Sequence, residues 1–282
     1  MPDVLLTGLG FGESPRWHEG RLWFSDMGTN ELSAVDTAGD REVIATIPGM
    51  PMGSGWLPEP DGRMLIVSSR DGKLLRREPD GSLVLGCDLA GLDPHPWGDM
   101  AVDGRGNAYI GNIGFDFPDG APAPGILALV TPGGTARQVA NGLQFPNGIA
   151  ITPDNRTLIV AESYASRLTA YDIAADGSLS GRRVWAELDN AAPDGICLDA
   201  EGAIWYADVP NRHCVRVREG GEVITTVALD RGCFACILGG ADGRTLFIVA
   251  AEFAGPASFA PGAPRTGQVV TVRATAPGAG WP

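Results

Sequence analysis

The chain has 282 residues, 44% of them hydrophobic, and closed all-β architectures often reach this length as one unit with a large core. Its 40 glycines and 22 prolines indicate many tight turns and few long helices. The 34 acidic and 21 basic residues give a formal charge of −13, so the surface repels nucleic-acid phosphates and anionic lipid. We therefore expect no nucleic-acid partner and no membrane partner.

The five cysteines are an odd number in a long chain, which favours reduced thiols and a cytoplasmic location. The first residues, MPDVLLTGLGFGESP, lack the basic and apolar regions of a secretory signal. No apolar run is long enough to span a bilayer. An exported form whose signal is missing from the sequence stays open.

A repeated pattern follows the chain: an apolar alternating run, a polar turn rich in Asp and Gly, and a second apolar run. The first unit, ESPRWHEGRLWFSD, starts at Glu13. The next units start at Gly55, Gly98, Asn147, Asp194 and Phe234. These starting points are 42, 43, 49, 47 and 40 residues apart, a period that suits four short strands per unit.

The local signals within each unit are those of β-hairpins. Turns such as HEGR, EPDGR and TPDNR contain the Gly or Asn that hairpins need, and runs such as RMLIVSS and AIWYAD are rich in strand-forming residues. No 3.6-residue period persists across a unit, which excludes a helical solenoid. The sequence predicts an all-β fold, a six-bladed β-propeller with four antiparallel strands per blade and a single domain over residues 1–282. Because a propeller closes to hide its sheet edges, we expect the segment GQVVTVRAT to join a blade that contains N-terminal residues.

The first residues of the innermost strands meet at the central channel of a propeller, even when they are distant in sequence. Those positions hold Glu13, Gly98 beside Asp99, Asn147 and Asp194. Carboxylate and amide oxygens that converge make an all-oxygen site for a hard divalent cation. A single Asp or Asn at such a position is more often a turn or cap group, so the prediction depends on their equivalent places in different repeats.

The segments GESPRW, PNGIAITPD, PDGICLDAEGAIWYAD and CFACILGG resemble the SMP-30/gluconolactonase/LRE family over nearly the whole chain. The resemblance implies a six-bladed propeller that hydrolyses lactones with a metal ion. It also implies that Glu13, Asn147 and Asp194 bind the metal, and that Asp194 faces the substrate as a candidate general base. Calcium is the expected ion, and zinc, magnesium or manganese are alternatives.

The sequence departs from the family pattern at the third unit, where an Asn-Asp pair is typical, often with an Arg before it. Here the stretch is Pro96, Trp97, Gly98 and Asp99, so neither the Asn nor the Arg is present. Loops near the expected channel mouth supply large side chains instead: Met52, Trp56, Trp97, Phe115, Phe117, Phe145, Phe234 and Phe253. We expect several of them, chiefly the first six, to bind a substrate less polar than a gluconolactone.

The leading hypothesis is a metal-dependent hydrolase of cyclic esters in which Asp194 or Asp99 accepts a proton from the attacking water. A lyase or isomerase that uses the same metal is one alternative. A non-catalytic propeller that binds calcium or another ligand is the other. We expect a small-molecule substrate and a monomer or a weak homo-oligomer.

Overall fold

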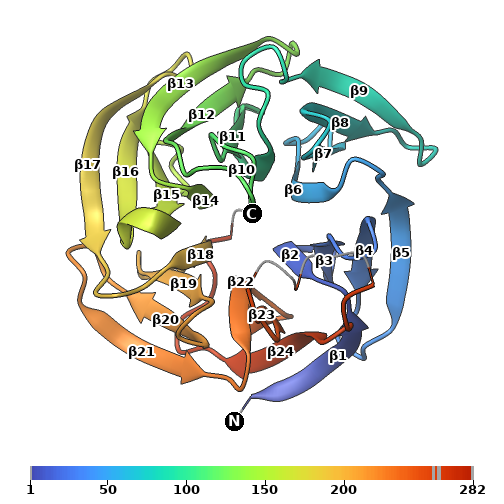
Figure 1. The fold of residues 1–282 in the computed structure, drawn as a ribbon, viewed down its shortest axis with the longest axis vertical. Coiled ribbons are helices and arrows are strands. Elements are labelled where there is room, and N and C mark those ends of the chain that lie inside the picture. The colour runs from blue at the N-terminus through green and yellow to red at the C-terminus, as the bar shows by residue number, and fades with distance from the viewer. Residues whose placement is uncertain (1, 256–257, 259–261, 281–282) are drawn as a thin grey trace.

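The structure is a computed structural model that describes residues 2–255, 258 and 262–280. Its strands form six antiparallel sheets of four strands each, arranged as blades around a common axis (Figure 1). This architecture confirms the predicted six-bladed β-propeller. Among the described residues, no helix has the length and apolarity needed to cross a membrane.

Each blade runs outward from an innermost strand beside the axis to an outermost strand at the rim (Figure 1). Blade one consists of β2 (Gly12–His18), β3 (Arg21–Asp26), β4 (Glu31–Val35) and β5 (Arg41–Thr46). Blade two consists of β6 (Pro51–Trp56), β7 (Met64–Ser68), β8 (Lys73–Arg77) and β9 (Leu83–Asp88). Blade three consists of β10 (Trp97–Val102), β11 (Ala108–Asn112), β12 (Gly125–Val130) and β13 (Ala136–Leu143).

The second half of the chain repeats this order. Blade four consists of β14 (Pro146–Ile151), β15 (Thr157–Glu162), β16 (Arg167–Ile173) and β17 (Leu179–Glu187), with the short 3-10 helix η1 (Ser163–Ala165) between β15 and β16. Blade five consists of β18 (Pro193–Leu198), β19 (Ile204–Asp208), β20 (His213–Val217) and β21 (Val223–Ala228). Blade six contains β22 (Gly232–Gly239), β23 (Thr245–Ala251) and β24 (Gly267–Arg273), and its fourth strand is β1 (Asp3–Leu9).

The two ends of the chain close the ring within blade six. Strand β1 pairs antiparallel with β24, from Asp3 opposite Thr271 to Leu9 opposite Gly267. The predicted partnership between the segment GQVVTVRAT and N-terminal residues is therefore confirmed. Closure in this way pairs the strand edge that the last blade would otherwise present to solvent.

The hydrophobic core lies between the faces of adjacent blades. Inner strands such as β10 and β11 are buried at every residue because a blade packs on each of their faces. Outer strands such as β13 and β21 carry several exposed residues. One core cluster joins Val67 and Leu74 of blade two to Ile110 and Val130 of blade three. Each blade is thus stabilised mainly by its neighbours, as expected for a repeat architecture.

Every innermost strand has a β-bulge or irregularity near its start. In blades one, four and five the register shifts between Glu13 and Arg16, between Pro146 and Ile149, and between Pro193 and Ile196. Comparable shifts occur in β6, β10 and β22. A bulge locally re-aims the side chains of its strand. Because all six innermost strands share this irregularity, their second residues occupy equivalent positions around the axis.

The sequence placed the start of the second blade at Gly55, and this position is wrong. Strand β6 begins at Pro51, so Gly55 is its fifth residue and Met52 is its second. The sequence pattern was aligned on the hairpin turn that follows the strand. That pattern does not reveal the bulge, which shifts the pairing between Pro51 and Ser54.

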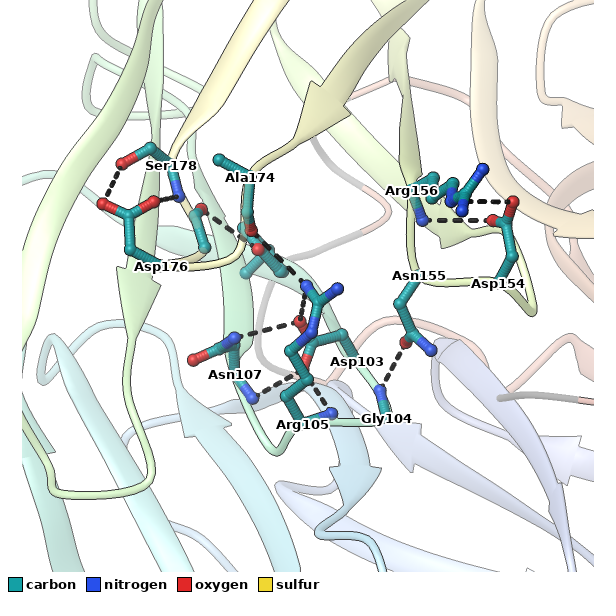
Figure 2. Close-up of polar contacts among 12 residues, drawn as sticks. Asp103, Gly104, Arg105, Asn107, Asp154, Asn155, Arg156, Ala174, Asp176 and Ser178 are labelled. Atoms are coloured by element: carbon teal, nitrogen blue, oxygen red, sulfur yellow. Dashed lines mark hydrogen bonds and ion pairs between the residues drawn. The ribbon is translucent and has the colours of Figure 1, made fainter.

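Blades three and four are also joined at the far ends of their innermost strands, where hairpin turns meet (Figure 2). The backbone N–H of Gly104 donates to Oδ1 of Asn155 at 2.6 Å, and Nη1 of Arg105 donates to the Ala174 carbonyl at 3.4 Å. Asp103 stabilises its own turn by accepting a hydrogen bond from the backbone N–H of Arg105 at 2.9 Å. These polar contacts hold the turn side of the two blades together, away from the first residues of the strands.

Candidate metal centre

Three polar side chains occupy the same place in three blades. Glu13, Asn147 and Asp194 are the second residues of β2, β14 and β18. Glu13 and Asp194 are only 7% and 9% exposed, although each carries a carboxyl group. The structure therefore brings two buried carboxyl groups and one amide to the same level of the propeller axis.

Glycines directly after two of these residues allow this convergence. A Cβ added at Gly148 would lie 2.5 Å from the backbone nitrogen of Ile196 and 2.6 Å from the carbonyl oxygen of Asp194. A Cβ added at Gly195 would lie 2.7 Å from Cα of Ala235 in blade six. All three distances are too short for any side chain, so the Asn-Gly and Asp-Gly pairs let adjacent innermost strands approach closely.

Burial raises the pKa of Glu13 well above its usual value, and repulsion by Asp194 raises it further. A hydrogen bond from the backbone N–H of Ser14 to Oε2 of Glu13, 3.0 Å long, acts in the opposite direction. Ser14 has a φ of 46°, a left-handed conformation that non-glycine residues seldom adopt. The strained backbone beside Glu13 is thus part of the local structure that turns this carboxyl group inward.

Burial also raises the pKa of Asp194 well above its usual value, and repulsion by Asp99 adds to the effect. A hydrogen bond from the Asn147 side chain lowers it in part. In the described structure, Oδ1 of Asp194 is buried and has no hydrogen-bond partner. Burying a carboxylate oxygen without a partner costs free energy, so a cation or a hydrogen-bond donor beside this atom would stabilise the site.

Asp99 has different surroundings, because both of its oxygens accept hydrogen bonds from protein groups. Oδ1 accepts from Nη2 of Arg16 at 2.8 Å, and Oδ2 accepts from the backbone N–H of Ile149 at 3.4 Å. The side chains of Arg16 and Asp99 are 5% and 6% exposed, so this is a buried ion pair. Arg16 also donates to the carbonyl oxygens of Pro15 and Met100. Arg16 was not among the residues predicted from the sequence, because the repeat pattern does not reveal a contact between blades one and three.

The residues present fit a hard divalent cation. Two buried carboxyl groups whose pKa values are both raised, together with a buried oxygen that lacks a partner, would be stabilised by a positive charge between them. In the described part of the chain, no group of three or more His, Cys, Asp or Glu side chains is arranged to hold a metal ion. The candidate set here has two such side chains, and its third member is the amide of Asn147.

Aromatic side chains from blades three and four gather beside Asn147. The ring of Phe145 lies 4.7 Å from Tyr164, 5.3 Å from Phe117 and 5.9 Å from Phe115, measured between centroids. Phe115 is buried, Phe117 and Phe145 are half-buried, and Tyr164 is 53% exposed. Phe145 lies two residues before Asn147, and Tyr164 follows Ser163, which contacts the Asn147 amide. Tyr164 was not among the residues predicted from the sequence, although its place directly after the second strand of its blade is a signal that could have identified it.

A second aromatic group lies near Glu13 in blades one and six. The rings of Phe11 and Phe234 are 4.3 Å apart, and those of Phe234 and Phe253 are 5.8 Å apart. Phe11 and Phe234 are buried, whereas Phe253 is 39% exposed. Aromatic surface therefore occurs on two sides of the candidate centre.

The remaining predicted substrate contacts have different positions. Met52 is half-buried and is the second residue of β6, at the level of Glu13. Trp97 is completely buried as the first residue of β10, and its Nε1 donates to the Asp93 carbonyl at 3.3 Å. Trp56 ends β6 and stacks on His18, the last residue of β2, with 3.9 Å between ring centroids. The structure thus places Trp56 at the opposite end of the innermost strands from Glu13.

Gly98 leaves an opening in the ring of second residues. A Cβ added there would meet only the carbonyl oxygen of Gly111, at 3.7 Å, within 4 Å. The opening belongs to blade three, whose β11–β12 connection carries Phe115 and Phe117. Blade three therefore has open space beside Gly98 at the axis and aromatic side chains on its β11–β12 connection.

A cavity of about 170 Å³ lies on the other side of Arg16, toward the turn end of the channel. Its wall is mainly apolar and includes Ile151, Leu198 and Leu238 from the ends of three innermost strands. The C-terminal segment borders it as well, because Ala279 N–H donates to the Leu198 carbonyl at 3.1 Å. The Arg16–Asp99 pair thus separates this cavity from the carboxyl groups of the candidate centre.

These features define a six-bladed propeller with an acidic centre near one end of its axis. The family described as SMP-30/Gluconolactonase/LRE-like region matches residues 11–252, and the chain belongs to this family. It is 27% identical over 284 residues to a pentonolactonase of Haloferax volcanii, covering 94% of this chain and 89% of that protein. It is 26% identical over 292 residues to a 6-deoxy-6-sulfogluconolactonase of Pseudomonas putida, covering 100% of this chain and 95% of that protein. Lactonases are thus among its relatives.

Solved structures share the fold at lower identity. A luciferin-regenerating enzyme matches with a TM-score of 0.84 and 20% identity, over 99% of this chain and 97% of that one. A calcium-binding protein, regucalcin, from Agrobacterium tumefaciens matches with a TM-score of 0.81 and 24% identity, over 98% of this chain and 94% of that one. These likenesses support the propeller architecture independently of the sequence repeats.

Proposed function

We propose that this protein is a metal-dependent lactonase, a hydrolase that opens cyclic esters to hydroxy acids. The observation that carries the proposal is the convergence of Glu13, Asn147 and Asp194 at equivalent bulged positions, with a buried Asp194 oxygen left unpartnered. The relatives named as lactonases supply the reaction class.

Glu13, Asn147 and Asp194 would hold the ion. Their all-oxygen donor set favours calcium, and zinc, magnesium or manganese are the alternatives. The calcium-binding relative of the same fold supports this choice. When bound, the ion would polarise the lactone carbonyl and stabilise negative charge on its oxygen.

Asp194 is the proposed proton acceptor. A water molecule attacks the carbonyl carbon, its proton passes to the carboxylate, the ring C–O bond breaks, and the ring oxygen is protonated as the hydroxyl of the product. Oδ1 of Asp194 has no competing donor in the described structure, whereas both oxygens of Asp99 already accept hydrogen bonds. We therefore assign Asp99 to holding Arg16 in place beneath the centre.

The proposed substrate is less polar than a sugar lactone. Phe115, Phe117 and Phe145 pack with Tyr164 in one aromatic cluster whose Phe145 lies two residues before Asn147, and Gly98 leaves space at the axis. An apolar lining with few polar groups selects ligands that bury hydrocarbon surface. Alkyl or aryl substituents on the lactone ring match that lining.

A panel of lactones tests the proposal with metal-stripped protein and with protein to which Ca²⁺, Zn²⁺, Mg²⁺ or Mn²⁺ is restored. We expect hydrolysis only after metal is restored, and a higher kcat/KM for alkyl- and aryl-substituted lactones than for sugar lactones. Equal or better turnover of sugar lactones would refute the substrate class and leave the reaction intact. Metal binding without turnover of any lactone would favour a non-catalytic calcium-binding propeller.

A further inference from the structure

Ser163 connects two of the proposed metal ligands across a blade interface. It is the first residue of η1, and its Oγ donates to the carbonyl oxygen of Pro193 at 2.7 Å. The same Oγ lies 3.3 Å from Nδ2 of Asn147 and accepts a hydrogen bond from it. Since Pro193 directly precedes Asp194, Ser163 bridges the Asn147 side chain of blade four and the backbone that carries Asp194 in blade five.

The hydroxyl group has only one hydrogen, and this limits what Asn147 can do. The hydrogen is committed to the Pro193 carbonyl, which can only accept, so Ser163 can act toward Asn147 only as an acceptor. The NH₂ end of the amide must therefore face Ser163. If the amide turned over, Oδ1 would face the lone pairs of the Ser163 oxygen.

With Nδ2 committed to Ser163, Oδ1 remains as the amide atom available to a cation. Amide orientation matters for a metal site because only the oxygen end of Asn is a ligand for hard cations.

The backbone around Ser163 holds its hydroxyl group in place. Its N–H donates to the Phe145 carbonyl at 3.1 Å, and the N–H of Tyr164 donates to the Gln144 carbonyl at 3.2 Å. Glu162 accepts from the N–H of Gln144 at 2.8 Å, so the same two segments are joined a third time. Ser163 is thus fixed to the residues that lead into β14 and to Asn147.

We propose that Ser163 is a positioning residue that orients the Asn147 amide so that its oxygen faces the metal. This inference rests on the proposed metal centre. Ser163 is not itself a proposed ligand, and the proposed role is exerted through Asn147. Removal of the groups that orient a metal ligand typically lowers metal affinity about 10- to 100-fold.

The test is calorimetric titration of Ca²⁺ into metal-stripped protein, repeated with Tb³⁺ luminescence as a second measure of affinity. For Ser163→Ala we expect a Kd about 10-fold higher than in the wild type. Ser163→Thr, which keeps the hydroxyl group, should retain near wild-type affinity. Ser178→Ala is the matched control, because the half-buried Ser178 lies at the β16–β17 turn and its side chain bonds with Asp176 and Arg137, which are both remote from the centre.

A double-variant cycle separates orientation from general structural damage. Asn147→Asp has an oxygen at both ends of the side chain, so it needs no orientation. In that background, Ser163→Ala should leave the Kd unchanged or lower it, because the Ser163 oxygen then faces a carboxylate oxygen and no longer accepts a hydrogen bond. A merely structural role would raise the Kd again. An unchanged Kd for Ser163→Ala in the otherwise wild-type chain would overturn the inference, and so would equal losses in both backgrounds. Failure of the wild-type protein to bind either ion would instead overturn the metal centre itself.

Discussion

Two acidic side chains near the axis differ in what surrounds them. Oδ1 of Asp194 lacks a partner in the described structure, and Asp99 is paired with Arg16. These surroundings agree with the two proposed tasks, proton acceptance for Asp194 and orientation of the buried Arg16 guanidinium for Asp99. Substitution by Asn separates these tasks, because Asn keeps the shape and one acceptor but lacks the charge.

We expect Asp194→Asn to reduce kcat by about 10²–10⁴-fold, the usual loss when a general base is removed, and to weaken metal binding. We expect Asp99→Asn to reduce kcat by less than about 10-fold with unchanged metal affinity, since Oδ1 can still accept from Arg16. Steady-state kinetics at saturating metal, combined with metal titration, measure both quantities. The opposite ranking, with Asp99→Asn the more damaging change to kcat, would assign proton acceptance to Asp99.

Glu162 forms a buried network at the end of β15. Its carboxylate accepts from Nε of Arg167 at 2.9 Å, from the hydroxyl of Thr169 at 2.5 Å and from the N–H of Gln144 at 2.8 Å. Burial alone would raise the pKa of Glu162, but these hydrogen bonds outweigh it and the pKa is lowered. The folded protein thus favours the charged form of Glu162 more than the unfolded chain does.

For Glu162→Gln we expect a loss of about 1–3 kcal/mol in the free energy of unfolding at pH 7. Because the folded pKa is lowered, the unfolded chain binds the proton first. The stabilisation is therefore complete above the ordinary glutamate pKa of 4.5 and is lost as the pH falls through the lower folded value. Urea unfolding between pH 4 and pH 7 should show that the difference in free energy of unfolding between Glu162→Gln and the wild type decreases as the pH falls. The control is Glu42→Gln, at an exposed pair with Arg21, and a gap that does not depend on pH would contradict the account.

At the scale of the element, the innermost strand is the unit that carries the proposed metal ligands. Each begins with residues that face the axis, contains a bulge, and ends in a hairpin turn at the opposite end. Close packing between neighbouring innermost strands determines how far the second residues lie from one another. The glycines after Asn147 and Asp194 are two places where that packing is very close, and Gly53 of β6 is another.

Gly195→Ala tests this dependence. The added methyl group would overlap with Ala235 in β22, so β18 must shift away, and overpacking of this kind costs about 1–3 kcal/mol. We expect a Tm lower by roughly 2–4 °C per kcal/mol, measured by calorimetry, together with weaker metal binding. Gly91→Ala is the control, because nothing lies within 4 Å of a Cβ at that exposed glycine. Wild-type stability and affinity in Gly195→Ala would show that the strand spacing is not limiting.

At the scale of the whole molecule, the ring is closed by β1 in blade six, and the candidate centre draws its ligands from blades one, four and five. A cation held by three blades would link them in addition to their packing. Without it, the carboxyl groups of Glu13 and Asp194 repel each other in a buried setting. The proposed metal centre would therefore lower the stability of the metal-free protein.

We expect Ca²⁺ to raise the Tm of the wild-type protein, with a stabilisation of about 2.7 kcal/mol at 100 times the Kd. A chelator should reverse it. Glu13→Gln removes one of the two repelling charges, so its metal-free Tm should equal or exceed that of the wild type. The response of this variant to Ca²⁺ should be lost. Thermal melts with and without chelator measure both effects. A wild-type Tm that changes with neither calcium nor chelator would contradict the proposed metal centre.

The sequence by itself determined the architecture, because each blade is a local unit. A repeat near 40–49 residues, hairpin turns with Gly or Asn, and alternating apolar runs all lie within one stretch of chain, so they predict six four-stranded sheets and the closure by β1. The equivalence of Glu13, Asn147 and Asp194 was visible for the same reason. Repetition marks the same strand position in each blade.

Only the tertiary structure decided which side chains meet across blades. Arg16 pairs with Asp99 over 83 positions of sequence, and Ser163 reaches Pro193 in the next blade, contacts that no local pattern encodes. The sequence does not reveal the bulges either, and this is why it predicted Gly55 as the start of a strand that begins at Pro51. Strand register depends on pairing between segments that are separate in the chain, so the geometry of the site emerges only when the blades pack around their axis.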